Sequence, residues 1–105
     1  MTQFEDRERA YEARFAHDEE LRFKSLARRN KLLGLWAAEK LGREGEAAEA
    51  YAKEVVRSDF AEPGDEDVFR KVRGDFNTGG VTIGDDELRL KMRELLVEAA
   101  DQLAK

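Results

Sequence analysis

The clearest candidates for chemistry are basic side chains close to the single tryptophan. Arg28, Arg29 and Lys31 precede Trp36 by a few residues. Cations of this kind hold phosphate groups, and an indole face stacks on a base or a cation. No glycine-rich phosphate loop accompanies them, and Arg and Lys stems commonly cover a helix face with their charges in water. We therefore favour a solvated helix face and keep a weak nucleotide or anion site as the alternative.

The segment "DFNTGGVTIGDD", residues 75–86, partly resembles a calcium-binding loop. Asp75 and Asn77 fit its first and third ligand positions, and Gly80 fits the position of the turn glycine. A glycine stands at the fifth position, and Asp86 replaces the bidentate glutamate at the last. Because too few oxygen ligands remain, the segment predicts a glycine turn and no metal site.

No combination of side chains indicates catalysis. The chain has no cysteine, which excludes a disulfide or a thiolate site. It also lacks a Ser–His–Asp arrangement in a supporting context, a metal-ligand cluster and a nucleophile elbow. We therefore expect a protein that is not an enzyme and that uses no cofactor. His17, the only histidine, supports one weak hypothesis: its protonation biases the orientation of the N-terminal segment.

Composition favours one small helical domain. The chain has 105 residues, of which 41% are charged and only one is proline, a balance that disfavours a β-sandwich or barrel. No signal peptide is visible, and no apolar run approaches the length of a membrane span. The net charge is −5, although residues 21–42 carry six bases against Glu39 alone. An acidic protein with one basic stretch is a poor candidate for nucleic-acid binding, and we expect a cytoplasmic protein.

Glycine and proline clusters at 41–46, 61–67 and 77–87 divide the chain, and the apolar spacing between them is helical. The prediction is an all-α fold, a small four-helix bundle with helices at about 18–41, 45–59, 65–77 and 85–104. Asp18 and Asp65 are expected N-caps. The helix up to residue 41 is apolar around its circumference, which is typical of a central helix. Gly34 within it would allow a neighbouring helix to approach closely.

Three aromatic residues precede the predicted bundle. Phe4, Tyr11 and Phe15 are seven and four residues apart, so they share one face of a helix. The core stripe of the next helix lies roughly 80° away and would continue backwards into mostly charged positions. We therefore predict a marginally helical segment at 1–18, detached or loosely docked, whose rings enter a groove of another protein, and a helical bundle at 19–105. The alternative is that the rings pack on a flank of their own bundle.

Four stretches carry a family resemblance: "FEDRERAYEARFAHDEELRFK", "ARRNKLLGLWAAEKLG", "YAKEVVRSDFAEPGDEDVFRKV" and "IGDDELRLKMRELL". In this order they closely resemble the zeta subunit, the ATPase inhibitor of alphaproteobacterial F-type ATP synthases. The resemblance covers essentially the whole chain, and its second stretch is the most specific part.

The resemblance implies a four-helix protein whose mobile N-terminal segment enters a catalytic interface of the enzyme head, against the rotor stalk, and blocks ATP hydrolysis. The remaining helices would anchor the protein on the outside of the head, peripheral to the inner membrane and without membrane insertion. Adenine nucleotide stays a weak further partner. Carried over to this sequence, the contacting side chains would be Phe4, Arg7, Arg9, Tyr11, Arg14 and Phe15.

Overall fold

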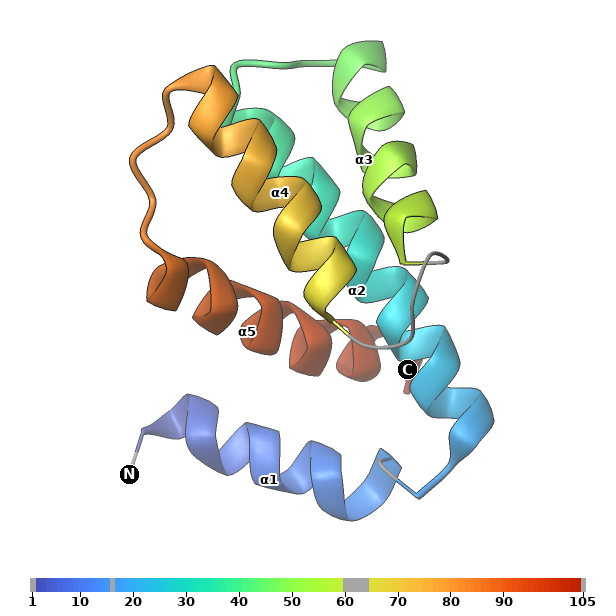
Figure 1. Cartoon of the computed structure of the whole chain (residues 1–105). Helices are drawn as coiled ribbons and strands as arrows, with labels where there is room; N and C mark the ends of the chain where they lie inside the picture. Colours follow the sequence, from blue (N-terminus) through green and yellow to red (C-terminus); the bar gives the residue numbers. More distant parts are fainter. Residues whose placement is uncertain (1, 16, 60–64, 105) are drawn as a thin grey trace.

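The computed structural model of the chain describes residues 2–15, 17–59 and 65–104 (Figure 1). These residues form five α-helices and no strand. The helices are α1 (Gln3–Phe15), α2 (Glu19–Lys40), α3 (Glu46–Ser58), α4 (Glu66–Gly79) and α5 (Asp85–Leu103). The predicted all-α class is confirmed. The count of four helices is wrong, because the N-terminal segment forms a regular helix of its own.

Asp18 and Asp65 stand at two of the predicted helix starts, and only one of them makes a capping hydrogen bond. The Asp18 carboxylate accepts a hydrogen bond from the backbone N–H of Leu21 at 3.0 Å, which confirms it as the N-cap of α2. Asp65 occupies the N-cap position of α4, but its side chain makes no capping bond and pairs with Arg29 instead. α4 ends at Gly80, whose φ of 74° is a left-handed conformation that glycine adopts easily.

α2 is the central helix, as its apolar circumference predicted. α3 and α5 both pack along it, and α4 also contacts it (Figure 1). The approach to α3 is close: a Cβ built at Gly34 would lie 2.6 Å from the Cα of Ala52. No real side chain tolerates that separation, so the predicted role of Gly34 in close helix packing is confirmed. The packing offsets a loss of about 1 kcal/mol in helix propensity at that glycine.

The main core lies among α2, α3, α4 and α5. Val81 and Ile83, in the connection before α5, pack against it and join that turn to the bundle. None of its members belongs to α1, so α2–α5 bury this core without the N-terminal helix. Its buried side chains are Leu33, Ala37, Ala38, Tyr51, Val55, Val68, Phe69, Val72, Phe76, Leu88, Met92 and Leu95.

α1 lies beside α5 and meets the start of α2 (Figure 1). The prediction of a detached or loosely docked segment compared its aromatic face with the core stripe of α2 alone. α5 presents a second apolar strip, which includes Val97 and Ala100, on a face that the main core does not use. The rings of α1 pack there, so the predicted mobility of this segment is not confirmed.

Candidate functional site

The aromatic face of α1 is buried against α5. Tyr11 and Phe15 keep only 8% and 9% of their surface exposed, and Phe4 is half-buried. The three rings pack with Val97 and Ala100, and the centroids of Tyr11 and Phe15 lie 5.8 Å apart. The structure therefore shows the alternative arrangement, in which the rings pack on a flank of their own bundle.

Two ion pairs flank these rings. The Glu8 carboxylate accepts hydrogen bonds from both nitrogens of the Arg93 fork, at 2.7 and 2.9 Å, and Arg7 pairs with Asp101. The Arg93 guanidinium also lies 5.5 Å from the ring centre of Phe4. Hydrogen bonding from Arg93 lowers the pKa of Glu8. Because both pairs face solvent, each contributes at most about 1 kcal/mol to the docking of α1.

The predicted partner contacts of α1 divide into two groups. Phe4, Tyr11, Phe15 and Arg7 are engaged with α5 in this arrangement. Arg9 and Arg14 are exposed, and the guanidinium of Arg14 lies 5.1 Å from the ring centre of Phe15. Arg9 and Arg14 therefore lie at the surface of the docked helix, whereas α5 covers the Tyr11 and Phe15 rings.

His17 is exposed between α1 and α2. It borders an open cleft of about 660 Å³, which Tyr11, Glu12, Arg22 and Asp65 also line. Burial raises the pKa of the Tyr11 hydroxyl above its ordinary value. The cleft carries charges of both signs at the junction that a reorienting α1 would use. The hypothesis that His17 protonation biases this helix stays a prediction.

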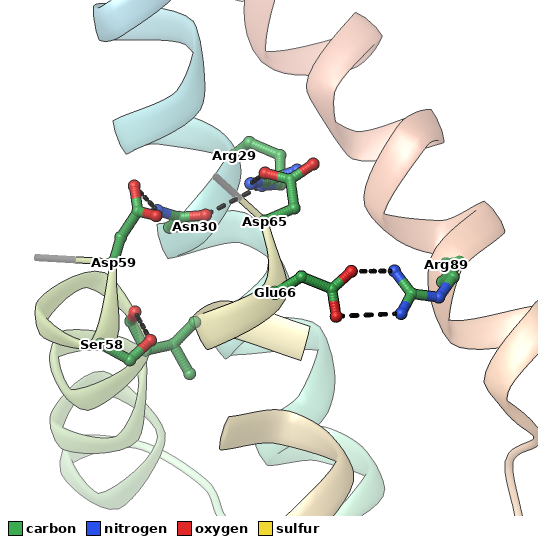
Figure 2. Close-up of polar contacts among 8 residues, drawn as sticks. Arg29, Asn30, Ser58, Asp59, Asp65, Glu66 and Arg89 are labelled. Carbon is green, nitrogen blue, oxygen red and sulfur yellow. Dashed lines mark hydrogen bonds and ion pairs between the residues drawn. The ribbon is translucent and has the colours of Figure 1, made fainter. Parts of the chain in front are cut away.

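Arg29 is the most deeply buried of the predicted anion-binding residues, with 1% of its surface exposed. Its guanidinium donates to Asp65 at 2.7 Å and to the side-chain oxygen of Asn30 at 2.9 Å (Figure 2). Asn30 in turn donates to Asp59 at 3.1 Å, and desolvation raises the pKa of that carboxyl. Arg29 and Asn30 thereby hold the end of α3 and the start of α4 against α2.

The other members of the predicted anion site point in different directions. Arg28 donates to Gln102 of α5 at 2.5 Å, and exposed Lys31 borders a groove beside α3. Trp36 is half-buried, with its ring centre 5.8 Å from that of Phe76. The structure does not bring the four side chains of the predicted site together around one pocket.

The segment that resembled a calcium loop begins inside α4. Asp75 and Asn77 belong to the last turns of that helix, and the Asp75 carboxylate accepts a hydrogen bond from Tyr51 at 2.8 Å. Lys71 pairs with the same carboxylate at 2.9 Å. Asp75 therefore links α4 to α3 through its hydrogen bond with Tyr51.

Similarity to known proteins identifies the family of the chain. A family model described as ATPase inhibitor subunit zeta matches residues 1–102, from before α1 into the last turn of α5. The chain belongs to this family. A solved structure, described as a solution NMR structure, is 50% identical to this zeta-family chain. That similarity covers 80% of this chain and 95% of the solved one, with a TM-score of 0.72. No curated protein matches the chain.

Two features of the zeta-family chain escaped the sequence analysis. The first is the α1-facing strip of α5, where Leu96 packs beside Val97 and Ala100, whereas the main core takes Leu88, Met92 and Leu95 from the same helix. The second is the pair between Glu8 and Arg93, which are 85 residues apart. The one sequence signal for the strip is the width of the apolar surface of α5. The pair between Glu8 and Arg93 has no local sequence signal. In the described part of the chain, no helix is long and apolar enough to cross a membrane.

Proposed function

We propose that this chain binds the catalytic head of an F-type ATP synthase and blocks ATP hydrolysis there. The observation that carries the proposal is the family match over residues 1–102, which includes both α1 and the helices that carry the main core. The family is described as an ATPase inhibitor subunit, a regulatory component of an enzyme. The protein would act on the cytoplasmic side of the membrane, held there through the enzyme.

In this proposal α1 is the inhibitory element, which enters a catalytic interface of the head against the rotor stalk. Three structural features support the assignment. The main core excludes α1, so the helix can move without opening that core. Its polar contacts with α5 face solvent, and such contacts are individually weak. Its aromatic residues are of the kind that anchor a helix in the groove of a partner.

Insertion would require α1 to exchange partners. Tyr11 and Phe15 are already buried against α5, so the head can reach these rings only by replacing Val97 and Ala100. The exposed Arg9 and Arg14 need no such change. They would make the first contacts with the head, and the rings would follow as the helix leaves the bundle. The contacts of Arg29 with Asp65 and Asn30 count against the alternative nucleotide site, because they already use its guanidinium.

The decisive test is ATP hydrolysis by the cognate head with and without the full chain. We expect the wild-type protein to abolish most hydrolysis, and the double variant Tyr11→Ala with Phe15→Ala to lose inhibition while it still binds the head. Leu90→Ala, on an exposed position of α5 outside the α1 contact, is the matched control and should inhibit as the wild type does. Hydrolysis that continues unchanged at a saturating excess of wild-type protein would refute the proposed function.

A further inference from the structure

A groove between α2 and α3 carries binding groups that the proposed inhibition by α1 does not use. It consists of two adjoining hollows that share Val56. The larger one, about 270 Å³, lies beside Lys31, Lys53 and Arg57, with Ala52 in its lining. The smaller one, about 50 Å³, extends towards Phe23 near the start of α2. We call this surface the α2–α3 groove.

Phe23 forms the aromatic end of the groove. It is 66% exposed, more than any other large hydrophobic side chain in the described part of the chain. Its ring makes no aromatic or cation–π contact with the described residues, unlike Phe4, Phe15, Phe69 and Phe76. Because most of its surface faces solvent, the Phe23 ring contributes less to the stability of the monomer than a buried ring would. Rings in such positions are frequent anchors of protein–protein contacts.

The rim of the larger hollow is mainly basic. Lys31, Lys53 and Arg57 form no ion pair with any described residue, and Glu49 is the acid among the residues that line this hollow. Lys53 and Arg57 are four residues apart on α3, a spacing at which like charges repel and mildly destabilise a helix. Across both hollows these three cations stand against the carboxylates of Glu49 and Asp59, a local excess of positive charge in a protein whose net charge is −5. Their arrangement suits a negatively charged partner.

We propose that the α2–α3 groove binds an acidic amphipathic segment of the ATP synthase head. An apolar side chain of that segment would lie over Val56 beside Phe23, and its carboxylates would pair with Lys31, Lys53 and Arg57. The identity of the partner rests on the proposed function. The groove contains no residue of α1 or α5, so the head can hold the bundle here while α1 leaves α5.

The shape and charge of the groove favour such a segment over other occupants. A membrane surface is flat and binds broad basic faces, whereas these cations border one narrow hollow in an acidic protein. A second copy that docked through the same surface would bury both Phe23 rings, but it would also place the basic rims of the two chains against each other, and like charges repel. The oligomeric state of the free protein separates this last possibility from the proposal.

The experiment measures the dissociation constant of the full chain for the cognate head at low and moderate salt. We expect Phe23→Ser to weaken binding about ten-fold or more, as loss of an aromatic anchor does. Lys53→Glu should weaken binding by a similar factor and reduce its salt dependence. That variant gains an opposite-charge spacing with Arg57 but creates a like-charge spacing with Glu49, so its two effects on α3 offset each other and thermal unfolding must show that the fold is kept.

Matched controls come from the same protein. Leu90→Ser removes the other exposed large hydrophobic side chain, and Lys40→Glu reverses a charge at the far end of α2. Both should bind within about two-fold of the wild type, a difference below the size of an anchoring contact. Thermal unfolding of every variant confirms that the bundle is intact.

The outcomes separate this inference from the proposed function. At saturating concentration the groove variants should still inhibit hydrolysis, because α1 is unchanged. Wild-type inhibition together with unchanged binding by Phe23→Ser and Lys53→Glu would overturn the groove and leave the proposed function standing. If the wild type binds the head without inhibiting it, and the groove variants bind more weakly, the proposed function of α1 would be refuted. The inference about the groove would then stand. A wild-type dimer that Phe23→Ser dissociates would overturn the inference in favour of self-association.

Discussion

The contacts that α1 makes with α5 and that α2 makes with α3 differ in kind. α2 and α3 meet through a glycine packed against backbone, with Gly34 and Ala52 almost fully buried. α1 and α5 meet through rings that face small residues, between ion pairs open to solvent. The first contact leaves no room for a larger side chain at Gly34. The second contact is made by side chains, and its ion pairs are exposed to solvent.

Tyr51 and Tyr11 illustrate the difference between the two kinds of contact. Tyr51 in α3 is 1% exposed, donates its hydroxyl to Asp75 at 2.8 Å and has a cation above its ring. Burial raises the pKa of that hydroxyl, and the bond to the carboxylate adds to the effect. Tyr11 in α1 is 8% exposed and lies at the edge of an open cleft. One tyrosine belongs to the main core and the other to the contact between α1 and α5.

The largest expected effect comes from substituting these tyrosines. Tyr51→Ala should lower the free energy of unfolding of the whole bundle by about 3–5 kcal/mol, the usual cost of removing a buried ring. Tyr11→Ala should leave the unfolding of α2–α5 within about 1 kcal/mol of the wild type and abolish hydrogen-exchange protection of α1 alone. Chemical denaturation and residue-resolved exchange measure the two quantities. Equal losses of global stability would show that α1 is part of the cooperative core.

The next effect concerns the glycine contact. Gly34→Val should destabilise the bundle by about 3 kcal/mol, because the added atoms meet the backbone of α3 and the helices must separate. Gly74→Ala is the matched control, since a Cβ at that helical position in α4 has no neighbour within 4 Å. It should stabilise the protein by about 0.5–1 kcal/mol through helix propensity. Denaturation midpoints test both, and a Gly34→Val variant as stable as the wild type would disprove the close contact.

The smallest effect concerns the ion pair that joins α1 to α5. Glu8→Gln removes a charge from the bidentate pair with Arg93 and should lower the exchange protection of α1 about two- to five-fold, the range of a surface ion pair. Glu66→Gln, which breaks the comparable pair with Arg89 between α4 and α5 (Figure 2), should leave α1 protection unchanged. A loss of α1 protection in both variants would mean that α1 responds to any change on α5.

The same pair predicts a dependence on pH. Because the folded-state pKa of Glu8 is lowered, its contribution to docking is present above the pKa of the unfolded state and is lost as pH falls through the folded-state value. Acidification below about pH 4.5 should therefore loosen α1 in the wild type. Glu8→Gln should show no such component. A wild type and a Glu8→Gln variant with identical acid profiles would contradict this assignment.

Periodic patterns predicted most of the bundle because its helices bury continuous stripes. α2 was expected at 18–41 and forms Glu19–Lys40, with Asp18 as its cap and Gly34 against its neighbour. The Val81 and Ile83 side chains in the short connection before α5 pack on the same core. These features depend on residues within a few turns of one another, which is the range at which sequence patterns are informative.

The candidate site was less predictable because it depends on residues distant in the sequence. Arg29 resembled a solvent-facing cation, yet Asp65, 36 residues later, makes its burial possible. The sequence predicted the aromatic face of α1 correctly, but it did not predict the surface of α5 on which that face packs. That neighbour is a strip of small side chains on α5, and small residues give a weak periodic signal beside the larger core stripe of Leu88, Met92 and Leu95.

The burial of Tyr11 and Phe15 also bears on how strongly an inhibitor of this design would act. In the proposed function α5 and the enzyme head compete for the same rings, so apparent affinity equals intrinsic affinity multiplied by the fraction of molecules whose α1 is undocked. A docked-to-free ratio of about 100 weakens binding by α1 about a hundred-fold, or about 2.7 kcal/mol. Substitutions that loosen the α1–α5 contact without touching the rings, such as those at Arg93 and Asp101, would therefore make a more potent inhibitor from a less ordered protein.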